Sequence, residues 1–383
     1  MTSGFPLRRW AGHGVAAALT AIALTAGSQA ALTGAQAAVR PAQAAASPAV
    51  TNPYSPAYHH PYRHGVVPSI PRLAKMRQWA RQHGIHAASA NNLSYGGGVD
   101  GIGVTTGPEQ VYLVFWGSQW GSQGSDGNGD VTLSGDPNGV APYLQEFFKG
   151  LGTGGELWSG VMTQYCDGAA SGAQSCPAGT QHVGYPSGGA LAGVWVDESS
   201  AAPSQATPAD IGNEAVSAAG FFGNTTAAAN RDAQYVIVSP TGTNPDNYQG
   251  QGFCAWHDWN GDSYVGVSSP YGDIAFTNLP YIPDAGASCG MDFVNSSGTL
   301  DGVSIVEGHE YAETVTDQNP AGGWTDSSGN ENGDKCAWIS PGTSGGSFNL
   351  SLTTGTFAVQ TTWANDGNGG AGACEGSHSI VTG

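Results

Sequence analysis

Continuous apolar runs at three places along the chain predict buried strands. Residues 111–116 (VYLVFW) and 235–239 (YVIVS) are rich in β-branched and aromatic side chains, and residues 191–197 form a shorter run. Strands that are covered on both faces have this composition, because neither set of alternating side chains meets water. We therefore predict that residues 111–116 and 235–239 are central strands of one sheet.

Apolar residues at helical spacing predict two helices that cover this sheet. The two patterns span residues 141–151 and 208–222, and Thr207 stands where it would cap the second helix. Residues 274–282 are also apolar but contain Pro280, which cannot donate to a neighbouring strand. We predict an edge strand there, which could bind an extended peptide by strand addition.

The last third of the chain adds a polar helix and a small β region. Residues 300–317 predict a helix with Thr299 as its cap and a thin apolar stripe. Residues 347–352 and 356–363 alternate and predict short strands in a Gly-rich C-terminal region. Strands and helices mixed in this way predict an α+β fold.

The N-terminal residues 1–37 have the pattern of a secretory signal peptide. Arg8 and Arg9 precede an apolar run at 15–26, and small residues follow at 35–37. The apolar run is too short to span a membrane. We therefore predict a secreted, extracellular protein without a membrane span, and prefer ordinary secretion to the twin-arginine route.

Charge divides the remainder into two parts, residues 38–95 and 96–383. Eight of the eleven basic residues precede Asp100 and no acidic residue does, whereas from Asp100 onward three basic residues oppose 29 acidic ones. Few clustered Lys and Arg exclude a nucleic-acid partner. We interpret 38–95 as a basic, Pro- and Ala-rich pro-segment, which docks on the acidic domain of residues 96–383 and covers its site until it is removed. A disordered linker with one short helix at 71–83 is the alternative.

Six cysteines in an exported chain predict disulfide bonds. Their order along the chain favours three local pairs: Cys166 with Cys176, Cys254 with Cys289, and Cys336 with Cys374. No C-x-x-C spacing occurs, so a zinc site built from cysteines is the weaker interpretation.

A metal-binding motif, His309-Glu310-Tyr-Ala-Glu313, lies in the polar helix. His309 and Glu313 are four residues apart, so they project from one helix face, with Glu310 beside them. In the pattern H-E-x-x-H, two histidines hold zinc and the glutamate takes a proton from the metal-bound water. Glu313 replaces the second histidine, and a carboxylate is also a zinc ligand. We predict zinc held by His309 and Glu313, with Glu310 as general base.

A surface helix is the competing interpretation of the same residues. It would pack through its apolar stripe (Ile305, Ala312, Val315) and show its polar residues to water. Glu307, Glu310 and Glu313 repel one another at this spacing, and the domain offers few Lys or Arg to offset them. A bound divalent cation would relieve the repulsion, which favours the metal site.

Zinc needs a third protein ligand, and acidic residues follow the helix. We rank Glu331 first and Asp334 second as that ligand. We expect Asp317 to contact the ligands and not the metal itself. Candidates for stabilising an oxyanion are Tyr311, His257 and His378. His59, His60 and His64 stand in a Pro-rich tract, and we do not assign them as ligands.

Two short fragments resemble the start of a calcium loop. They are Asp126-Gly-Asn128-Gly-Asp130 and Asp258-Trp-Asn260-Gly-Asp262. In both, the Gly and the terminal Glu of that loop are absent at the offsets where they are required. We therefore interpret the two fragments as plain turn-rich loops and keep Ca²⁺ as a second candidate ion.

With Glu331 downstream, the motif His309-Glu310-Tyr-Ala-Glu313 resembles the gluzincin-type zincin metalloproteases. The resemblance implies a zincin-like mixed sheet, an active-site helix, zinc, and a protein or peptide substrate. A fainter similarity is to the secreted Exordium or phosphate-induced proteins and their bacterial relatives, carried by Val114-Phe-Trp116-Gly and by Asp334-Lys-Cys336. This similarity implies the same helix and the same metal-binding residues, but it implies no particular reaction.

Three functional hypotheses follow. The leading one is a secreted zinc-dependent endopeptidase. The alternative is a non-catalytic cell-wall or matrix protein. It would bind metal, and it would bind polysaccharide through exposed Trp and Tyr. A metal-free acid peptidase is the third, although no Asp-Thr-Gly motif supports it.

Overall fold

The structure is a computed structural model that describes residues 52–84 and 92–383. The predicted signal peptide, residues 1–37, lies outside the described residues, as does the first part of the predicted pro-segment. Within the described ranges, no helix combines the length and the apolar character needed to cross a membrane.

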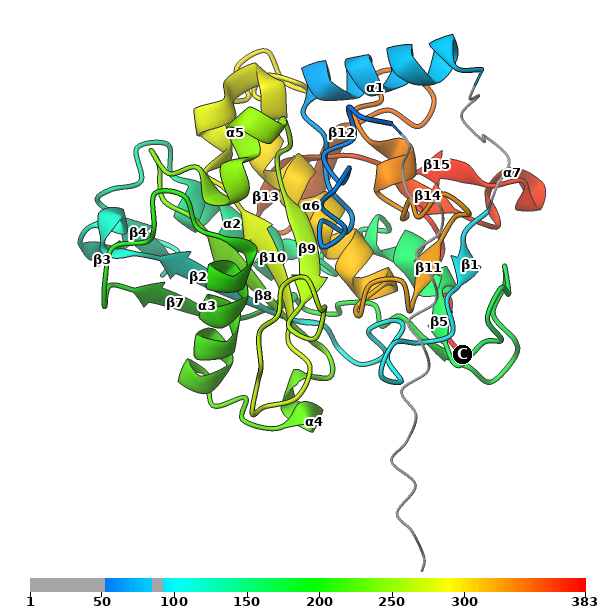
Figure 1. Ribbon diagram of the computed structural model, residues 1–383, viewed down its shortest axis with the longest axis horizontal. Helices are drawn as coiled ribbons and strands as arrows, with labels where there is room; N and C mark the ends of the chain where they lie inside the picture. The colour runs from blue at the N-terminus through cyan, green and yellow to red at the C-terminus, as the bar shows by residue number, and fades with distance from the viewer. Residues whose placement is uncertain (1–51, 85–91) are drawn as a thin grey trace, which may run out of the picture. The chain divides into compact units, whose positions relative to one another are not determined.

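A five-stranded mixed sheet forms the centre of the domain (Figure 1). Its order is β7 (Leu191–Asp197), β2 (Gln110–Trp116), β8 (Ala233–Val238), β10 (Ala275–Leu279) and β9 (Trp256–Trp259). The first four strands are parallel, and β9 runs antiparallel to β10. The α+β class and the central position of β2 and β8 are therefore confirmed.

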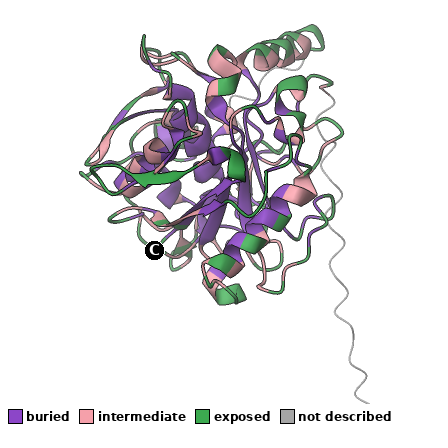
Figure 2. Ribbon diagram, turned by 90° about the vertical axis from the view of Figure 1, so that its left-hand side faces the viewer, coloured by how far each residue is buried: buried purple, intermediate pink, exposed green. Residues whose placement is uncertain are grey.

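Two cores cover the two faces of the sheet. Val111, Leu113 and Phe115 face one core, which includes α2 (Val140–Gly150) and α6 (Asp301–Thr316). The alternate residues of β2 face the second core under α3 (Pro208–Phe221), whose first turn is capped by Thr207 as predicted. Figure 2 shows the buried residues gathered on the sheet and on the helix faces beside it. Burial on both faces explains the continuous apolar run of β2.

The edge strand predicted at residues 274–282 is wrong. β10 ends at Leu279 and lies between β8 and β9, so Pro280 follows the strand and interrupts no ladder. β9, which was not predicted as a strand from the sequence, is one of the two edge strands of the sheet, and β7 is the other.

The remaining elements are short. The helices are α1 (Ile70–Gln82), α4 (Ala227–Asn230), α5 (Tyr248–Gln251) and α7 (Gly367–Gly370), and the 3₁₀ turns are η1 (Ser118–Trp120), η2 (Ser159–Gln164), η3 (Pro245–Asn247), η4 (Ile282–Cys289) and η5 (Asp334–Cys336). Antiparallel pairs join β1 (Ser94–Tyr95) to β11 (Trp324–Thr325), β3 (Gln123–Ser125) to β4 (Val131–Leu133), β5 (Cys166–Asp167) to β6 (Gln181–His182), β12 (Phe348–Leu352) to β13 (Gly355–Val359), and β14 (Thr362–Ala364) to β15 (Ala373–Glu375). The last two pairs confirm the predicted C-terminal β region. All three predicted disulfides are present.

Helix α6 is buried along its whole length. Each of its 16 residues is buried, polar and apolar alike. Gly308 packs against Phe147 and Trp158, and a Cβ there would lie 3.4 Å from the Phe147 ring, in ordinary van der Waals contact. The surface-helix interpretation is therefore wrong. The predicted cap is also wrong, because Leu300 occupies the cap position and makes no side-chain cap bond.

Part of the predicted pro-segment lies along the free edge of β9, beside that strand in Figure 1. We call residues 62–69 the covering segment. Its backbone bonds to β9 and the residues before it, with Cys254 N–H donating to Val67 O at 2.8 Å and Val67 N–H to Ala255 O at 3.1 Å. Val66 packs in one core and Val67 in the other. The segment therefore continues the sheet as an added antiparallel strand.

Arg63 anchors this segment through a buried ion pair. Its Nε lies 2.7 Å from Asp246 Oδ2, and the guanidinium carbon lies 4.6 Å from the centre of the Phe253 ring. The Arg63 side chain is 1% exposed. A buried, hydrogen-bonded pair of this kind fixes the position of the chain on both sides of it.

Replacing Glu109 by Gln should flatten the pH dependence of stability. Burial, reinforced by the charge of Asp232, raises the pKa of Glu109 from 4.5 to about 8. The unfolded chain ionises first, so the free energy of unfolding falls as pH rises from 4.5 to 8, by about 1.4 kcal/mol per pH unit for one such group. Denaturant unfolding at pH 5 to 8 measures the slope. The exposed Glu198→Gln is the control, and equal slopes in both variants would contradict the expectation.

Candidate metal centre

Helix α6 and the loop after it bring His309, Glu313 and Asp334 together. His309 Nε2 lies 3.0 Å from Glu313 Oε2 and 3.8 Å from Asp334 Oδ1. The other oxygen of Glu313 accepts the Asp334 backbone N–H at 2.8 Å. Because that bond holds the carboxylate, Oε2 remains turned toward the histidine. These three residues form one group whose ligand atoms lie within 4.8 Å of one another.

Gln360 determines which nitrogen of His309 carries the proton. The Gln360 amide nitrogen donates to Gly333 O at 2.8 Å, so its oxygen faces His309 Nδ1 at 3.1 Å. That oxygen accepts a hydrogen bond from Nδ1–H, which leaves the lone pair of the neutral ring on Nε2. Metal-binding histidines are oriented by a second hydrogen bond of this kind.

His309 Nε2 is surrounded by acceptors. Besides Glu313 and Asp334, the carbonyl oxygen of Gly65 lies 3.1 Å from it. A neutral imidazole has no second proton to give these oxygens. The arrangement requires a protonated ring, a protonated carboxyl group, or a cation that all four atoms share. Nitrogen with carboxylate oxygen is a donor set that zinc accepts.

A second group joins His257 of β9 to Glu310 and Glu313. His257 Nε2 lies 3.9 Å from Glu313 Oε2 and 3.2 Å from Glu331 Oε2. Neither oxygen of Glu310 has a hydrogen-bond partner among the described residues. Glu310 therefore presents a free carboxyl group to the cluster, next to the residues that would hold a metal.

Burial shifts the protonation of the whole cluster. It raises the pKa of Glu310, Glu313 and Asp334 well above their usual ranges, and neighbouring acidic groups add to the shift. It also lowers the pKa of His257 to about 3, with His309 contributing. The carboxyl groups of this cluster are therefore either protonated or balanced by a cation, and a divalent cation would supply the charge that lets them ionise.

The remaining site residues predicted from the sequence lie in different surroundings in the structure. Glu331 faces His257, whereas Asp334 groups with His309 and Glu313. Asp317 accepts the Ala321 and Gly323 N–H groups, and so holds the turn after α6. Tyr311 packs against Phe148 and Trp158, and His378 pairs with Asp366. Of the oxyanion candidates, His257 alone belongs to the groups described above.

Two contributors to the site, Gly65 and Gln360, were not assigned from the sequence. His257 was a candidate for stabilising an oxyanion, but the strand β9 that carries it was not predicted. No sequence pattern links Gly65 or Gln360 to His309, because they lie 244 and 51 residues away from it along the chain. The first calcium-like fragment is a hairpin turn, in which Asp126 Oδ1 accepts the Asn128 and Asp130 N–H groups.

Replacing Gln360 by Leu should weaken metal binding by about 10- to 100-fold, because the ring of His309 loses the bond that orients it. Competition with a chromogenic zinc chelator measures the dissociation constant. Gln145→Leu is the matched control, since Gln145 is equally buried and bonds Val131 O and Ala141 O instead. Equal affinities in the two variants would contradict the role of Gln360.

Comparison of the chain with protein-family models, with curated proteins and with solved structures finds no match in any of the three. The functional conclusion therefore depends on the chemistry of the site itself.

Proposed function

We propose that the protein is a secreted, zinc-dependent endopeptidase. The observation that carries this proposal is the surroundings of His309 Nε2, which faces three oxygen acceptors while Gln360 holds the proton on Nδ1. His309, Glu313 and Asp334 would hold the zinc ion, and Glu331 is the alternative third ligand. This assignment keeps the resemblance to the zincin metalloproteases, with Glu313 in the place of their second histidine.

The residues around the zinc position divide the chemistry between them. Zinc supplies Lewis acidity toward the substrate carbonyl and makes a bound water more acidic. Glu310 accepts a proton from the attacking water and delivers it to the amine as the peptide C–N bond breaks. His257, a buried imidazole grouped with Glu310 and Glu313, would donate a hydrogen bond to the carbonyl oxygen.

A peptide substrate has a ready binding mode on β9. This edge strand offers its backbone groups to an added antiparallel strand, and extended peptides bind in that way. The covering segment now makes those bonds, with its Gly65 carbonyl directed at His309. We therefore extend the proposal to a zymogen, in which the covering segment occupies the path of the substrate until the chain is cut.

One observation favours the alternative of a non-catalytic metal-binding protein. Val67 is fully buried in the main core, so the covering segment also serves as part of the fold. A segment that never leaves would block a substrate permanently. The polysaccharide part of this alternative has less support, because no tryptophan within the described residues is exposed, although Tyr54, Tyr58 and Tyr264 are.

A chelation experiment on the secreted protein tests the proposal. The precursor and a sample with the covering segment cut are compared for zinc content by elemental analysis and for casein hydrolysis. We expect the cut form to lose at least about 100-fold in rate on chelation, in line with the contribution of a catalytic metal, and to recover when zinc is added. His309→Ala should lose the ion. Hydrolysis that persists in chelator would exclude the metalloprotease, and bound zinc without hydrolysis would favour the binding protein.

A further inference from the structure

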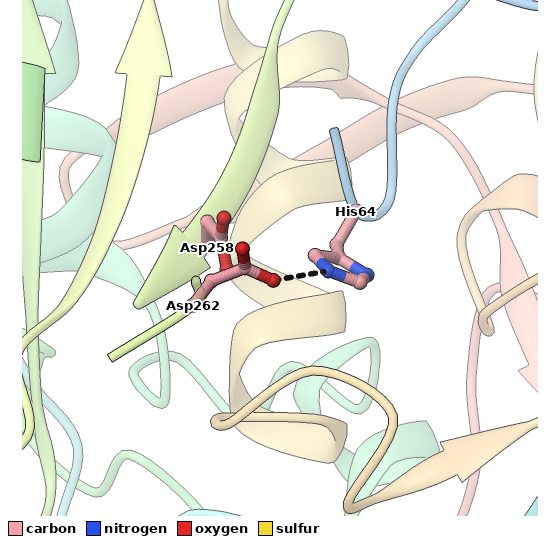
Figure 3. Close-up of side chains that lie close together, drawn as sticks. All are labelled: His64, Asp258 and Asp262. Atoms are coloured by element: carbon pink, nitrogen blue, oxygen red, sulfur yellow. Dashed lines mark ion pairs between the residues drawn. The ribbon is translucent and has the colours of Figure 1, made fainter. Parts of the chain in front are cut away.

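A separate cluster lies where the covering segment meets the end of β9. It consists of His64 from the segment, Asp258 from β9 and Asp262 from the loop that follows (Figure 3). Their ligand atoms lie within 4.8 Å of one another, and His64 Nε2 is 3.6 Å from Asp262 Oδ2. None of these residues belongs to the groups around His309.

Asp258 is the unusual member of this cluster. It is fully buried, and one of its oxygens accepts the Trp259 N–H at 2.8 Å. The other oxygen has no hydrogen-bond partner among the described residues. A buried carboxylate oxygen without a partner is costly unless a proton or a cation satisfies it.

Asp262 is held so that one oxygen remains available. Its Oδ1 accepts the Tyr264 N–H at 2.6 Å, which turns Oδ2 toward His64. The acidic groups that act on Asp258 are Asp262, Glu331 and Asp317, so the surroundings add negative charge to the pair. His64 is the positive or metal-binding partner that the cluster contains.

We infer that His64, Asp258 and Asp262 form a second metal site, which takes a divalent ion of the zinc class and fastens the covering segment to the domain. One imidazole nitrogen and two carboxylate oxygens suit zinc and its neighbours, whereas calcium prefers six or more oxygen ligands. The domain supplies two ligands and the segment the third.

The site couples metal binding to docking of the segment. When the segment leaves, the ion loses one of its three protein ligands, so its affinity falls. By linkage, the bound ion stabilises the docked segment to the same extent. The second ion therefore acts on the covering segment whether or not the His309 site performs hydrolysis.

Zinc stoichiometry of the secreted, uncut precursor tests the site. After equilibration with a zinc buffer, elemental analysis should find two ions in the wild type and one in His64→Ala and in Asp262→Asn. His59→Asn is the matched control from the same stretch, since His59 is exposed and asparagine tolerates its positive φ of 64°. It should retain two ions. Zinc should also slow tryptic cleavage at the exposed Lys75 and Arg81 several-fold in the wild type but not in His64→Ala.

The outcomes separate this inference from the proposed function. One ion in the wild type that survives His64→Ala and is lost in His309→Ala overturns the second site and leaves the first. Two ions in the wild type, with one lost in His64→Ala and none lost in His309→Ala, support the second site and remove the first. Two ions in both the wild type and His64→Ala overturn the inference, because the second ion then lies elsewhere.

Discussion

Glu310→Gln in the cut form should reduce casein hydrolysis by about 100- to 10,000-fold, the contribution expected of a general base. The amide keeps the shape of the side chain but cannot accept a proton from water. Glu310 is not among His309, Glu313 and Asp334, so zinc content should remain that of the wild type. Hydrolysis rate and elemental analysis on the same samples measure both effects.

Glu307→Gln is the matched control. Glu307 lies one turn earlier on α6, is fully buried, and has no hydrogen-bond partner on either oxygen among the described residues. It belongs to none of the potential metal groups. The two variants therefore share the same chemical change in the same helix, and hydrolysis should be lost in Glu310→Gln alone. A loss of equal size in both would show that the packing of α6, and not a proton transfer, was disturbed.

Gly65→Ala should release the covering segment and make the uncut precursor active. A Cβ at this position would overlap Glu313 Oε2 and the ring of His257, and Gly65 has φ of +53°. The left-handed conformation alone costs alanine about 1–2 kcal/mol, which is about a tenfold shift in the docking equilibrium before the overlap is counted. We therefore expect casein hydrolysis by the precursor to rise at least about tenfold.

Gly84→Ala separates this effect from backbone strain. Gly84 has φ of +66° but open space around its Cβ position, at the end of α1. The same substitution there carries the conformational cost without the overlap, so the precursor should stay inactive. Tryptic cleavage at Lys75 and Arg81, beyond the covering segment, provides a readout that needs no catalysis, and it should be faster in Gly65→Ala. If cleavage and hydrolysis are unchanged in Gly65→Ala, the segment does not control access to the site.

The elements predicted correctly from the sequence are those whose burial follows a simple pattern. β2 and β8 are covered on both faces, and α2 and α3 on one, so their apolar residues repeat as strands and helices require. The order of the cysteines sufficed for the three disulfides because each pair closes a short loop of 10 to 38 residues. Residues 309–313 gave the candidate metal ligands because they lie within one helical turn.

The failures have physical causes of a different kind. Pro280 lies one residue beyond β10, but the predicted strand ran on to residue 282, and this boundary error changed an internal strand into an edge. The burial of α6 does not follow from its polarity, because polar groups enter a core when other polar groups or an ion satisfy them. Gly65 meets His309 only through the docking of the covering segment, which depends on the complete fold.

The complete enclosure of α6 restricts how this part of the sequence can vary. Ordinary amphipathic helices tolerate change on the face that meets water, but α6 has no such face. A Cβ at Gly302 would overlap the Cys289 carbonyl, so glycine is needed there, whereas a Cβ at Gly308 would make ordinary contacts with two aromatic rings. A search for distant relatives should therefore look for sixteen consecutive constrained positions with glycine at the second. The five residues of the metal motif alone would retrieve many unrelated chains.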